Sequence, residues 1–141
     1  MEYIPIQIFI CIVIFVLGTA VGSFLNVCIF RIPVHEDIVS KRSRCMQCGN
    51  VLKWYELIPL LSFCIQRGRC RHCRCTLSWQ YPCIELLNGV LYVWITVSNG
   101  LCMESLLYCL LGSVLIVISV IDLQTMEIPF LLNLCVFFWE Q

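Results

Sequence analysis

The sequence predicts an all-α polytopic membrane protein with about three transmembrane helices, the start of a fourth, and a small cytoplasmic zinc-knuckle domain. Of its 141 residues, 60% are hydrophobic and only 13% are charged, whereas soluble domains carry roughly 25% charged residues. All nine Lys and Arg residues lie between Arg31 and Arg74, and the same segment contains two Cys-x-x-Cys pairs. This pattern leaves room for one small extramembrane domain between apolar helices.

The first expected transmembrane helix occupies residues 1–30. The run from Ile4 to Phe30 is almost entirely apolar, and no Lys or Arg precedes Arg31. The basic start of a cleaved signal peptide is therefore missing. Because membrane proteins keep their basic loops in the cytoplasm, we expect an uncleaved helix that begins outside and ends at a cytoplasmic loop, residues 31–82. The Gly18-x-x-x-Gly22 pattern is compatible with close packing against another helix.

The second and third expected helices occupy residues 83–98 and 105–121. The apolar part of the second helix is short for a crossing, which needs about 20 residues. Its Tyr81-Pro82 end is therefore expected at the membrane interface. Ser98-Asn99-Gly100 is typical of a tight turn between the two helices. The third helix returns to the cytoplasm, which puts Asp122 on the same side as the cysteine pairs.

The last segment, residues 122–141, is expected to begin with a loop that carries Asp122 and to continue into a further apolar run. The stretch from Phe130 to Trp139 is too short to cross a bilayer, and we expect it to be the truncated start of a fourth helix. The alternative is a short interfacial or re-entrant tail.

A structural zinc site is predicted in the cytoplasmic loop, with four cysteine ligands: Cys45, Cys48, Cys70 and Cys73. Two Cys-x-x-Cys pairs with 21 residues between them suit tetrahedral zinc, since each pair forms a knuckle that turns two thiolates toward one ion. Thiols in the cytoplasm stay reduced, so disulfides are not expected even though the chain has twelve cysteines. The ligand set has one ambiguity, because Cys75 and His72 lie beside the second pair and either could replace a ligand.

The alternative to a metal site is a set of free thiols in a chain that is rich in cysteine throughout. Cysteines in or near the apolar helices are expected to be small packing residues. These are Cys11, Cys28, Cys102, Cys109 and Cys135.

Asp122 is the candidate catalytic residue. It follows the apolar run that ends at Ile121, and Pro129 comes seven residues later. A carboxylate near hydrocarbon is costly, which makes such a residue a functional-site hypothesis. The alternative is a residue that caps or solvates the end of a helix.

These residues resemble the motifs of the type IV prepilin peptidases, from about Gly18 to Pro129. Gly22 to Val27, followed by Arg31 and Pro33, is similar to the family's signature at the end of the first helix. The cytoplasmic domain is similar in Cys45-x-x-Cys48, Trp54-Tyr55-Glu56, Ile58-Pro59, Ser62 and Gly68-Arg69-Cys70-x-x-Cys73. Ser78, Tyr81-Pro82 and Glu85-Leu86-Leu87 resemble the start of its second helix. Asp122 with Ile128-Pro129 resembles the motif around its first catalytic aspartate.

The resemblance implies a bacterial inner-membrane aspartic protease. Such an enzyme cleaves the basic leader of type IV pilin-like precursors and N-methylates the new N-terminus. The implied site consists of Asp122 as a catalytic residue and zinc at the four cysteines. S-adenosylmethionine is implied as a cofactor, although no Gly-rich strand-turn-helix signature locates it. The implied partners are prepilin or pseudopilin precursors and the lipid bilayer, without nucleic acid.

The sequence departs from the family at three points. Gln80 and Phe130 stand where the family often has an arginine and a polar or acidic residue. The second catalytic aspartate, in a Gly-x-Gly-Asp sequence, has no counterpart in the 141 residues.

This last departure bears on activity, because aspartic proteolysis needs one carboxylate to take a proton from water and another to protonate the peptide oxygen. Glu127 is five residues from Asp122 and would face another side of a helix. We therefore expect no prepilin cleavage by this chain alone, and a separate chain is a candidate source of the second aspartate.

Two other functions stay open from the sequence. An inactive truncated remnant, or a zinc-bearing membrane scaffold, would carry the same cysteines without peptidase activity. A membrane thiol-redox protein fits the number of cysteines, but its reactive pair would need to be exposed and free of metal.

Overall fold

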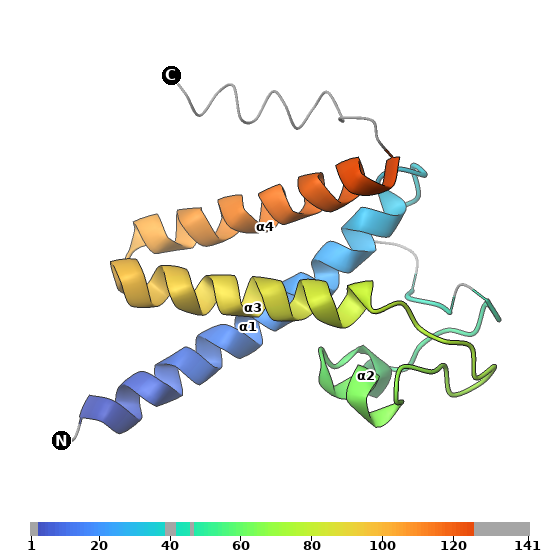
Figure 1. Ribbon diagram of the computed structural model, residues 1–141, viewed down its shortest axis with the longest axis horizontal. Helices are drawn as coiled ribbons and strands as arrows, with labels where there is room; N and C mark the ends of the chain where they lie inside the picture. The colour runs from blue at the N-terminus through green and yellow to red at the C-terminus, as the bar shows by residue number, and fades with distance from the viewer. Residues whose placement is uncertain (1–2, 39–41, 46, 126–141) are drawn as a thin grey trace.

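The computed structural model describes residues 3–38, 42–45 and 47–125, and this part of the chain is helical and contains no strand. Its three long helices are α1 (Tyr3–Arg31), α3 (Gln80–Asn99) and α4 (Met103–Thr125) (Figure 1). The segment between α1 and α3 carries a 3-10 helix, η1 (Trp54–Leu57), and a short helix, α2 (Leu61–Ile65). Two isolated β-bridges also lie in this segment, Arg44–Val51 and Arg69–Thr76.

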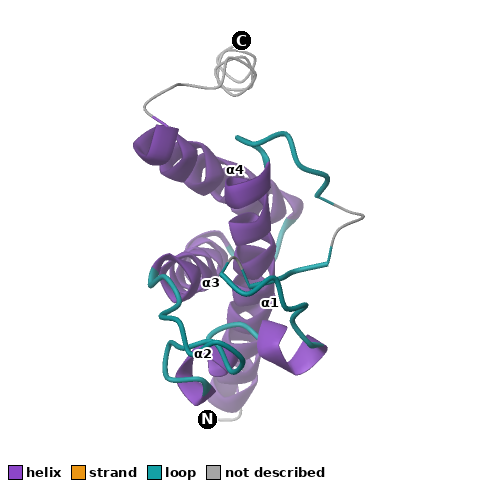
Figure 2. Ribbon diagram, turned by 90° about the vertical axis from the view of Figure 1, so that its right-hand side faces the viewer, coloured by secondary structure: helices purple, strands orange, loops and turns teal. Residues whose placement is uncertain are grey.

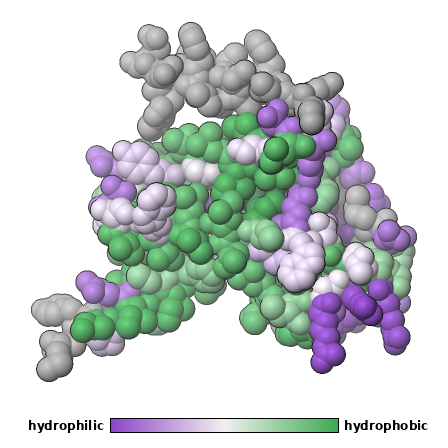
Figure 3. All heavy atoms as spheres, viewed as in Figure 1, coloured by the Kyte–Doolittle hydropathy of each residue, from purple (hydrophilic) through white to green (hydrophobic). Residues whose placement is uncertain are grey.

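The three long helices alternate in direction along the chain. As a result, the end of α1, the start of α3 and the end of α4 lie at one end of the bundle (Figure 1). The described residues between α1 and α3, here called the loop segment (32–38, 42–45 and 47–79), gather at this end as well (Figure 1 and Figure 2). Apolar side chains cover the helices, whereas hydrophilic side chains gather over the loop segment (Figure 3). The separation matches a membrane part and an aqueous part of one molecule.

The end of α1 follows from the local sequence. The helix stops at Arg31, two residues before Pro33, because a proline disfavours the α conformation in the residue that precedes it. Pro5 is tolerated near the other end, since the first turn of a helix does not need its backbone N–H.

The apolar core joins all three long helices near the end that carries the loop segment. Ile29 of α1 and Ile121 of α4 are almost completely buried. Leu25, Ile84 and Val117 pack in the same cluster. This contact fixes the end of α4 against α1 and α3, and it thereby positions the residue after Ile121.

A buried polar network joins the same helices. The Nδ2 atom of Asn88 donates to the carbonyl oxygen of Gly18 at 2.8 Å, and its Oδ1 atom accepts from the Ser113 hydroxyl at 2.9 Å. The hydroxyls of Ser113 and Tyr92 are 3.0 Å apart. Because an unpaired polar group in hydrocarbon costs several kcal/mol, these bonds fix the register of α3 against α1 and α4.

Close packing of α1 and α3 depends on Gly18 and Gly22 of α1. A Cβ atom added to Gly18 would lie 2.8 Å from the Cα atom of Gly89, and one added to Gly22 would lie 2.8 Å from the Cα atom of Glu85. Both contacts are with backbone, which cannot move aside cheaply. The two helices therefore pack closely at these glycines, an arrangement with which the sequence pattern is compatible.

The predicted fold class is confirmed. Two helices, α1 and α4, are long and apolar enough to cross a membrane, with mean hydropathies of 2.7 and 2.5. Helix α3 has 20 residues and is less apolar, because its buried face includes Glu85 and Asn88. Its crossing of the membrane, expected for residues 83–98, stays a prediction.

Helix α4 is longer than the expected span of residues 105–121. It continues to Thr125, so Asp122 lies in its last turn and not in a following loop. The helix continues because neither Gly nor Pro follows Ile121 until Pro129, and the Thr125 hydroxyl donates to the Ile121 carbonyl oxygen at 2.8 Å. The expected fourth helix, with Glu127 and Phe130, lies outside the described residues.

Candidate metal centre and the neighbouring helix ends

The four predicted zinc ligands come together in the loop segment. The sulfur atoms of Cys45, Cys48, Cys70 and Cys73 all lie within 4.8 Å of one another. The first cysteine of each pair is buried and the second is exposed, and no described cysteine forms a disulfide. Four converging free thiols fit a thiophilic divalent cation, since zinc takes four thiolates in a tetrahedron. The cluster is able to hold such an ion, as the sequence predicts.

The two knuckles share one backbone design. The backbone N–H of Cys45 donates to the Asn50 carbonyl oxygen, and that of Cys70 donates to the Cys75 carbonyl oxygen, both at 2.9 Å. The residue after the second cysteine has a positive φ in each knuckle, 69° at Gly49 and 56° at Arg74. The chain thus forms the same tight turn twice, 25 residues apart, and Cys75 occupies the position that Asn50 has in the first knuckle.

A fifth thiol lies beside the predicted ligands. The Cys75 sulfur is 3.2 Å from the Cys73 sulfur and 3.8 Å from the Cys45 sulfur. His72 is exposed and does not belong to the group of converging ligand atoms. Of the two residues that the sequence leaves as possible replacements, the geometry favours Cys75.

The thiols of the cluster share protons unequally. The backbone N–H of Cys48, aided by that of Gln47 and by thiol donors, lowers the pKa of Cys45 to about 6. The backbone N–H of Asn50 lowers the pKa of Cys48, but loss of water contact and hydrogen bonds with neighbouring thiols outweigh it and raise that pKa to about 11. The Cys45 thiolate therefore accepts hydrogen bonds from neighbouring thiols that keep their protons. A cation would replace those protons, because metals bind thiolates.

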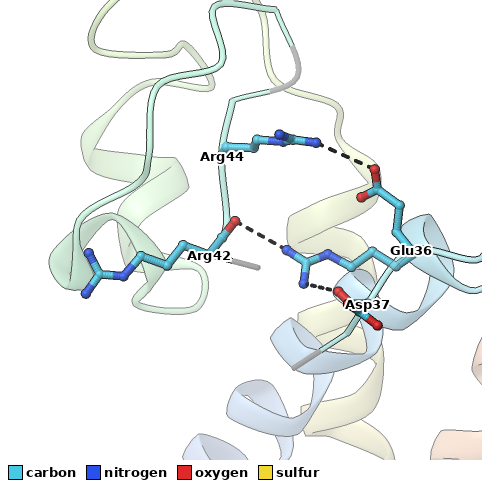
Figure 4. Close-up of polar contacts among 5 residues, drawn as sticks. Glu36, Asp37, Arg42 and Arg44 are labelled. Atoms are coloured by element: carbon cyan, nitrogen blue, oxygen red, sulfur yellow. Dashed lines mark hydrogen bonds and ion pairs between the residues drawn. The ribbon is translucent and has the colours of Figure 1, made fainter. Parts of the chain in front are cut away.

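Arg31 ties the loop segment to the end of α1. Its guanidinium donates to the carbonyl oxygens of Asp37 at 3.0 Å and Arg42 at 3.4 Å, and Figure 4 draws both contacts as dashed lines. Arg44, the residue before the first ligand, forms an ion pair of 3.6 Å with Glu36. An exposed pair of this kind contributes about 0–1 kcal/mol, so the Arg31 bonds to the backbone are the firmer link.

Glu85 ties the loop segment to α3. Its carboxylate accepts a hydrogen bond of 2.7 Å from the backbone N–H of Leu60, and its side chain is only 7% exposed. Leu60, the residue directly before α2, has a positive φ of 58°. An unpaired buried N–H costs about 1–3 kcal/mol, so the bond to Glu85 helps to hold this strained turn against the bundle.

Asp122 lies at the same end of the bundle as the thiol cluster. Its side chain is partly exposed, one residue beyond the buried Ile121. The Nε2 atom of Gln124 donates to the Oε1 atom of Gln80 at 2.8 Å, which joins the end of α4 to the start of α3. A carboxylate is therefore presented where the helices meet the loop segment.

Two residues of the site were quoted from the sequence only as parts of longer motifs. Glu85 is one of them, and an acid inside an apolar helix is itself a signal of a special role. Asn26 is the other: its Nδ2 atom donates to the carbonyl oxygens of Gly22 and Tyr81, at 3.3 and 3.2 Å. Its buried Oδ1 atom has no partner among the described residues. Sequence pattern alone does not show which of two amide atoms is left unpaired.

Comparisons with known proteins agree with this architecture. The model of the family described as "Bacterial Peptidase A24 N-terminal domain" matches residues 16–99. The chain is 47% identical over 116 residues to the prepilin leader peptidase/N-methyltransferase of Myxococcus xanthus, covering 82% of this chain and 35% of the relative. It is 36% identical over 117 residues to the protein of that name from Bacillus subtilis, covering 83% of this chain and 47% of the relative.

A third relative matches along nearly the whole chain. The Vibrio cholerae protein of the same name is 35% identical over 145 residues, covering 97% of this chain and 55% of the relative. The chain thus spans about a third to a half of the length of these relatives. No solved structure matches it significantly.

Proposed function

The chain belongs to the bacterial A24 peptidase family of prepilin leader peptidase/N-methyltransferases, and on this premise we propose that it is the N-terminal portion of such an enzyme. The proposed reaction is cleavage of the basic leader of a type IV pilin-like precursor at the cytoplasmic membrane face. Methylation of the new N-terminus follows. S-adenosylmethionine is proposed as the methyl donor from the relatives' name alone, and no residue is assigned to it.

The observation that carries the proposal is the place of Asp122. It lies partly exposed in the last turn of α4, at the end of the bundle where the loop segment gathers. The bond between Gln124 and Gln80 supports this arrangement. A precursor helix lying in the membrane beside α4 would present its leader junction at this level.

In the proposed chemistry, Asp122 is one of two carboxylates. Two close carboxylates share one proton, because both cannot ionise cheaply. The ionised member takes a proton from the attacking water, and the protonated member donates to the peptide oxygen. We propose that the second member comes from residues outside these 141, so that this chain alone does not cleave prepilin.

For the thiol cluster we propose structural zinc bound by Cys45, Cys48, Cys70 and Cys73. Four thiolates complete a tetrahedron and leave no open position for water or substrate. Zinc there would supply folding free energy to a loop segment that has little core of its own. The ion would hold the loop segment at the end of the bundle where Asp122 lies, without entering the reaction.

The test is prepilin cleavage in cells that co-express this chain with a membrane fragment carrying the Gly-x-Gly-Asp helices of a relative. We expect cleavage only when both are present. Asp122→Asn should lower the rate by about 10⁴-fold or more, as in other catalytic units. Glu104→Gln, exposed at the opposite end of α4, is the matched control and should leave cleavage unchanged.

The alternative is a zinc-bearing membrane scaffold or remnant, which the single candidate aspartate favours. No cleavage with the helper fragment, while zinc is still bound, would support the scaffold. Rapid cleavage by the 141 residues alone would contradict the need for a second acid from elsewhere.

A further inference from the structure

The thiol cluster contains one more sulfur than a tetrahedral ion uses. Cys75 lies 3.2 Å from Cys73 and 3.8 Å from Cys45. Nothing in the knuckle requires a cysteine at this position, because Asn50 occupies the equivalent place in the first knuckle and makes the same backbone bond. The thiol of Cys75 is therefore surplus to the fold, and its position beside the ligands needs another explanation.

The sulfur–sulfur distances show which corner of the tetrahedron Cys75 can occupy. Zn–S bonds of about 2.3 Å place two ligand sulfurs about 3.8 Å apart. Cys45 is 3.9 Å from Cys73 and 3.8 Å from Cys75, so either of them satisfies this distance from Cys45. The distance between Cys73 and Cys75, 3.2 Å, is too short for two corners of one tetrahedron.

We propose that Cys75 is an exchangeable ligand of the metal centre, which competes with Cys73 for a single corner while Cys45, Cys48 and Cys70 stay bound. This inference rests on the metal site proposed above and goes beyond it by assigning a role to the fifth thiol. Metal binding would then survive the loss of Cys73 from the second knuckle, but not the loss of Cys48 from the first knuckle. His72 has no part in the exchange, since its side chain is exposed, whereas the Cys75 sulfur contacts those of Cys45 and Cys73.

The two knuckles supply a matched pair of variants. Cys48 and Cys73 are both the second cysteine of a pair and both are exposed, but only Cys73 has a neighbouring spare thiol two residues later. Cys73→Ser should therefore keep four thiolates on the metal. Cys48→Ser should keep three. Cys73→Ser combined with Cys75→Ser should behave like Cys48→Ser.

The experiment is titration of the full chain, purified in detergent under reducing conditions, with Co²⁺ and then Zn²⁺. The sulfur-to-cobalt charge-transfer band reports the number of bound thiolates, and displacement of Co²⁺ reports zinc affinity. We expect wild type, Cys75→Ser and Cys73→Ser to give equal bands and zinc affinities within about tenfold. Changes outside the ligand shell alone cost about 10–100-fold in affinity, so Cys48→Ser and the double variant should lose at least about tenfold along with part of the band.

Further variants keep the test decisive. Asn50→Cys in the Cys48→Ser background should restore the four-thiolate band, because it places a thiol where Cys75 lies in the second knuckle. Cys64→Ser, an exposed cysteine outside the cluster, should change nothing. Equal loss in Cys73→Ser and Cys48→Ser would overturn the exchange, as would loss of a thiolate in Cys75→Ser. Absence of cobalt binding in wild type would instead remove the metal site itself.

Discussion

The carboxylate of Glu85 accepts a hydrogen bond from the backbone N–H of Leu60, 25 residues earlier, at 2.7 Å. The bond joins the buried face of α3 to Leu60, the residue with a positive φ directly before α2. Gly22 lies against the Cα atom of Glu85, so the same short stretch of α3 contacts both α1 and the loop segment. Glu85 is thus the joint between the apolar bundle and the domain that carries the cysteines.

Removing the Glu85 carboxylate should loosen the loop segment. Glu85→Ala leaves the Leu60 N–H without its partner, at a cost of about 1–3 kcal/mol, whereas Glu85→Gln keeps an acceptor and should cost less. The measurement is limited trypsin digestion at the exposed Arg67 and Arg69, with rates in the order Ala, Gln, wild type from fastest to slowest. Glu104→Gln should digest like wild type. Equal rates for all four proteins would mean that the bond does not hold the loop.

The glycines of α1 should be much less tolerant of alanine than the glycine of α4. A Cβ atom at Gly22 meets the backbone of α3 at 2.8 Å, whereas one at Gly112 meets the Cδ2 atom of Leu91 at 2.6 Å, the far end of a flexible side chain. Gly22→Ala should therefore cost about 1–3 kcal/mol through overpacking, and Gly112→Ala clearly less.

Thermal unfolding in detergent, followed by circular dichroism, compares these two variants. Both substitutions add one methyl group inside a helix, so intrinsic helix propensity favours both equally. A lower unfolding temperature for Gly112→Ala than for Gly22→Ala would contradict the packing of α1 against α3.

Arg74 should gain stability when it is replaced by glycine. It adopts a φ of 56° at the position where the first knuckle has Gly49 with a φ of 69°. An L-residue in this left-handed region costs about 1–2 kcal/mol. We expect Arg74→Gly to raise the unfolding temperature of the metal-loaded protein, and Gly49→Ala to lower it. Arg71→Gly, which replaces an arginine without a positive φ, should not stabilise; a gain there would show that charge and not backbone strain is responsible.

The thiol cluster is the part of the candidate site that the sequence predicts best. The spacing of the cysteines predicts the four converging thiols, and the confinement of the bases to residues 31–74 predicts which end of the bundle carries them. Both are local patterns. The bond between Glu85 and Leu60 and the contact between Gln80 and Gln124 join residues far apart in the chain, and only the packed helices reveal them.

The helix end that carries Asp122 could be predicted only in part from the sequence. Hydropathy predicts where an apolar run stops, at Ile121, but a helix continues until its backbone is interrupted or capped. The turn that contains Asp122 is therefore polar and still helical. Cys75 is a further example, since its part in the cluster depends on three-dimensional distances that a Cys-x-x-Cys pattern does not contain.

Metal binding should release at least two protons at pH 8, one each from Cys48 and Cys73. Hydrogen bonds with neighbouring thiols help to raise the pKa of Cys48 to about 11, against the pull of the Asn50 backbone N–H. The Cys75 backbone N–H lowers the pKa of Cys73, but the Cys75 thiol and loss of water contact raise it to about 11. Cys45, with a pKa of about 6, is already ionised and releases none.

The stabilisation that bound metal provides should depend on pH. Bound metal holds its ligands as thiolates, so their pKa values are depressed in the loaded protein, and the stabilisation is present at high pH and lost as the pH falls. Calorimetric titration with Zn²⁺ in buffers of different ionisation enthalpy counts the protons. A chelator at pH 8 should lower the unfolding temperature of the loop segment. Zinc binding without proton release would contradict the ligand set.

The last prediction concerns the orientation of the bundle in the membrane. Asn50 lies in the loop segment, and Asn99 is the last residue of α3, at the opposite end of that helix. Twenty helical residues span about 30 Å at 1.5 Å per residue, which equals the hydrocarbon thickness of a bilayer. All nine bases lie in the sequence between Arg31 and Arg74, the segment that contains Asn50, and basic loops stay in the cytoplasm.

Fusions at Asn50 and Asn99 should therefore report opposite sides. Alkaline phosphatase, active only outside, should be inactive at Asn50 and active at Asn99, and green fluorescent protein should give the reverse. A fusion after Thr125, at the end of α4, should match Asn50, because α4 returns to the end where the loop segment lies. Matching signals at Asn50 and Asn99 would mean that α3 does not cross the membrane. Without that crossing, α3 and α4 would not return the chain to the side of the cysteines, and Asp122 would lie on another side of the membrane. The proposed cytoplasmic cleavage site would then lose its basis.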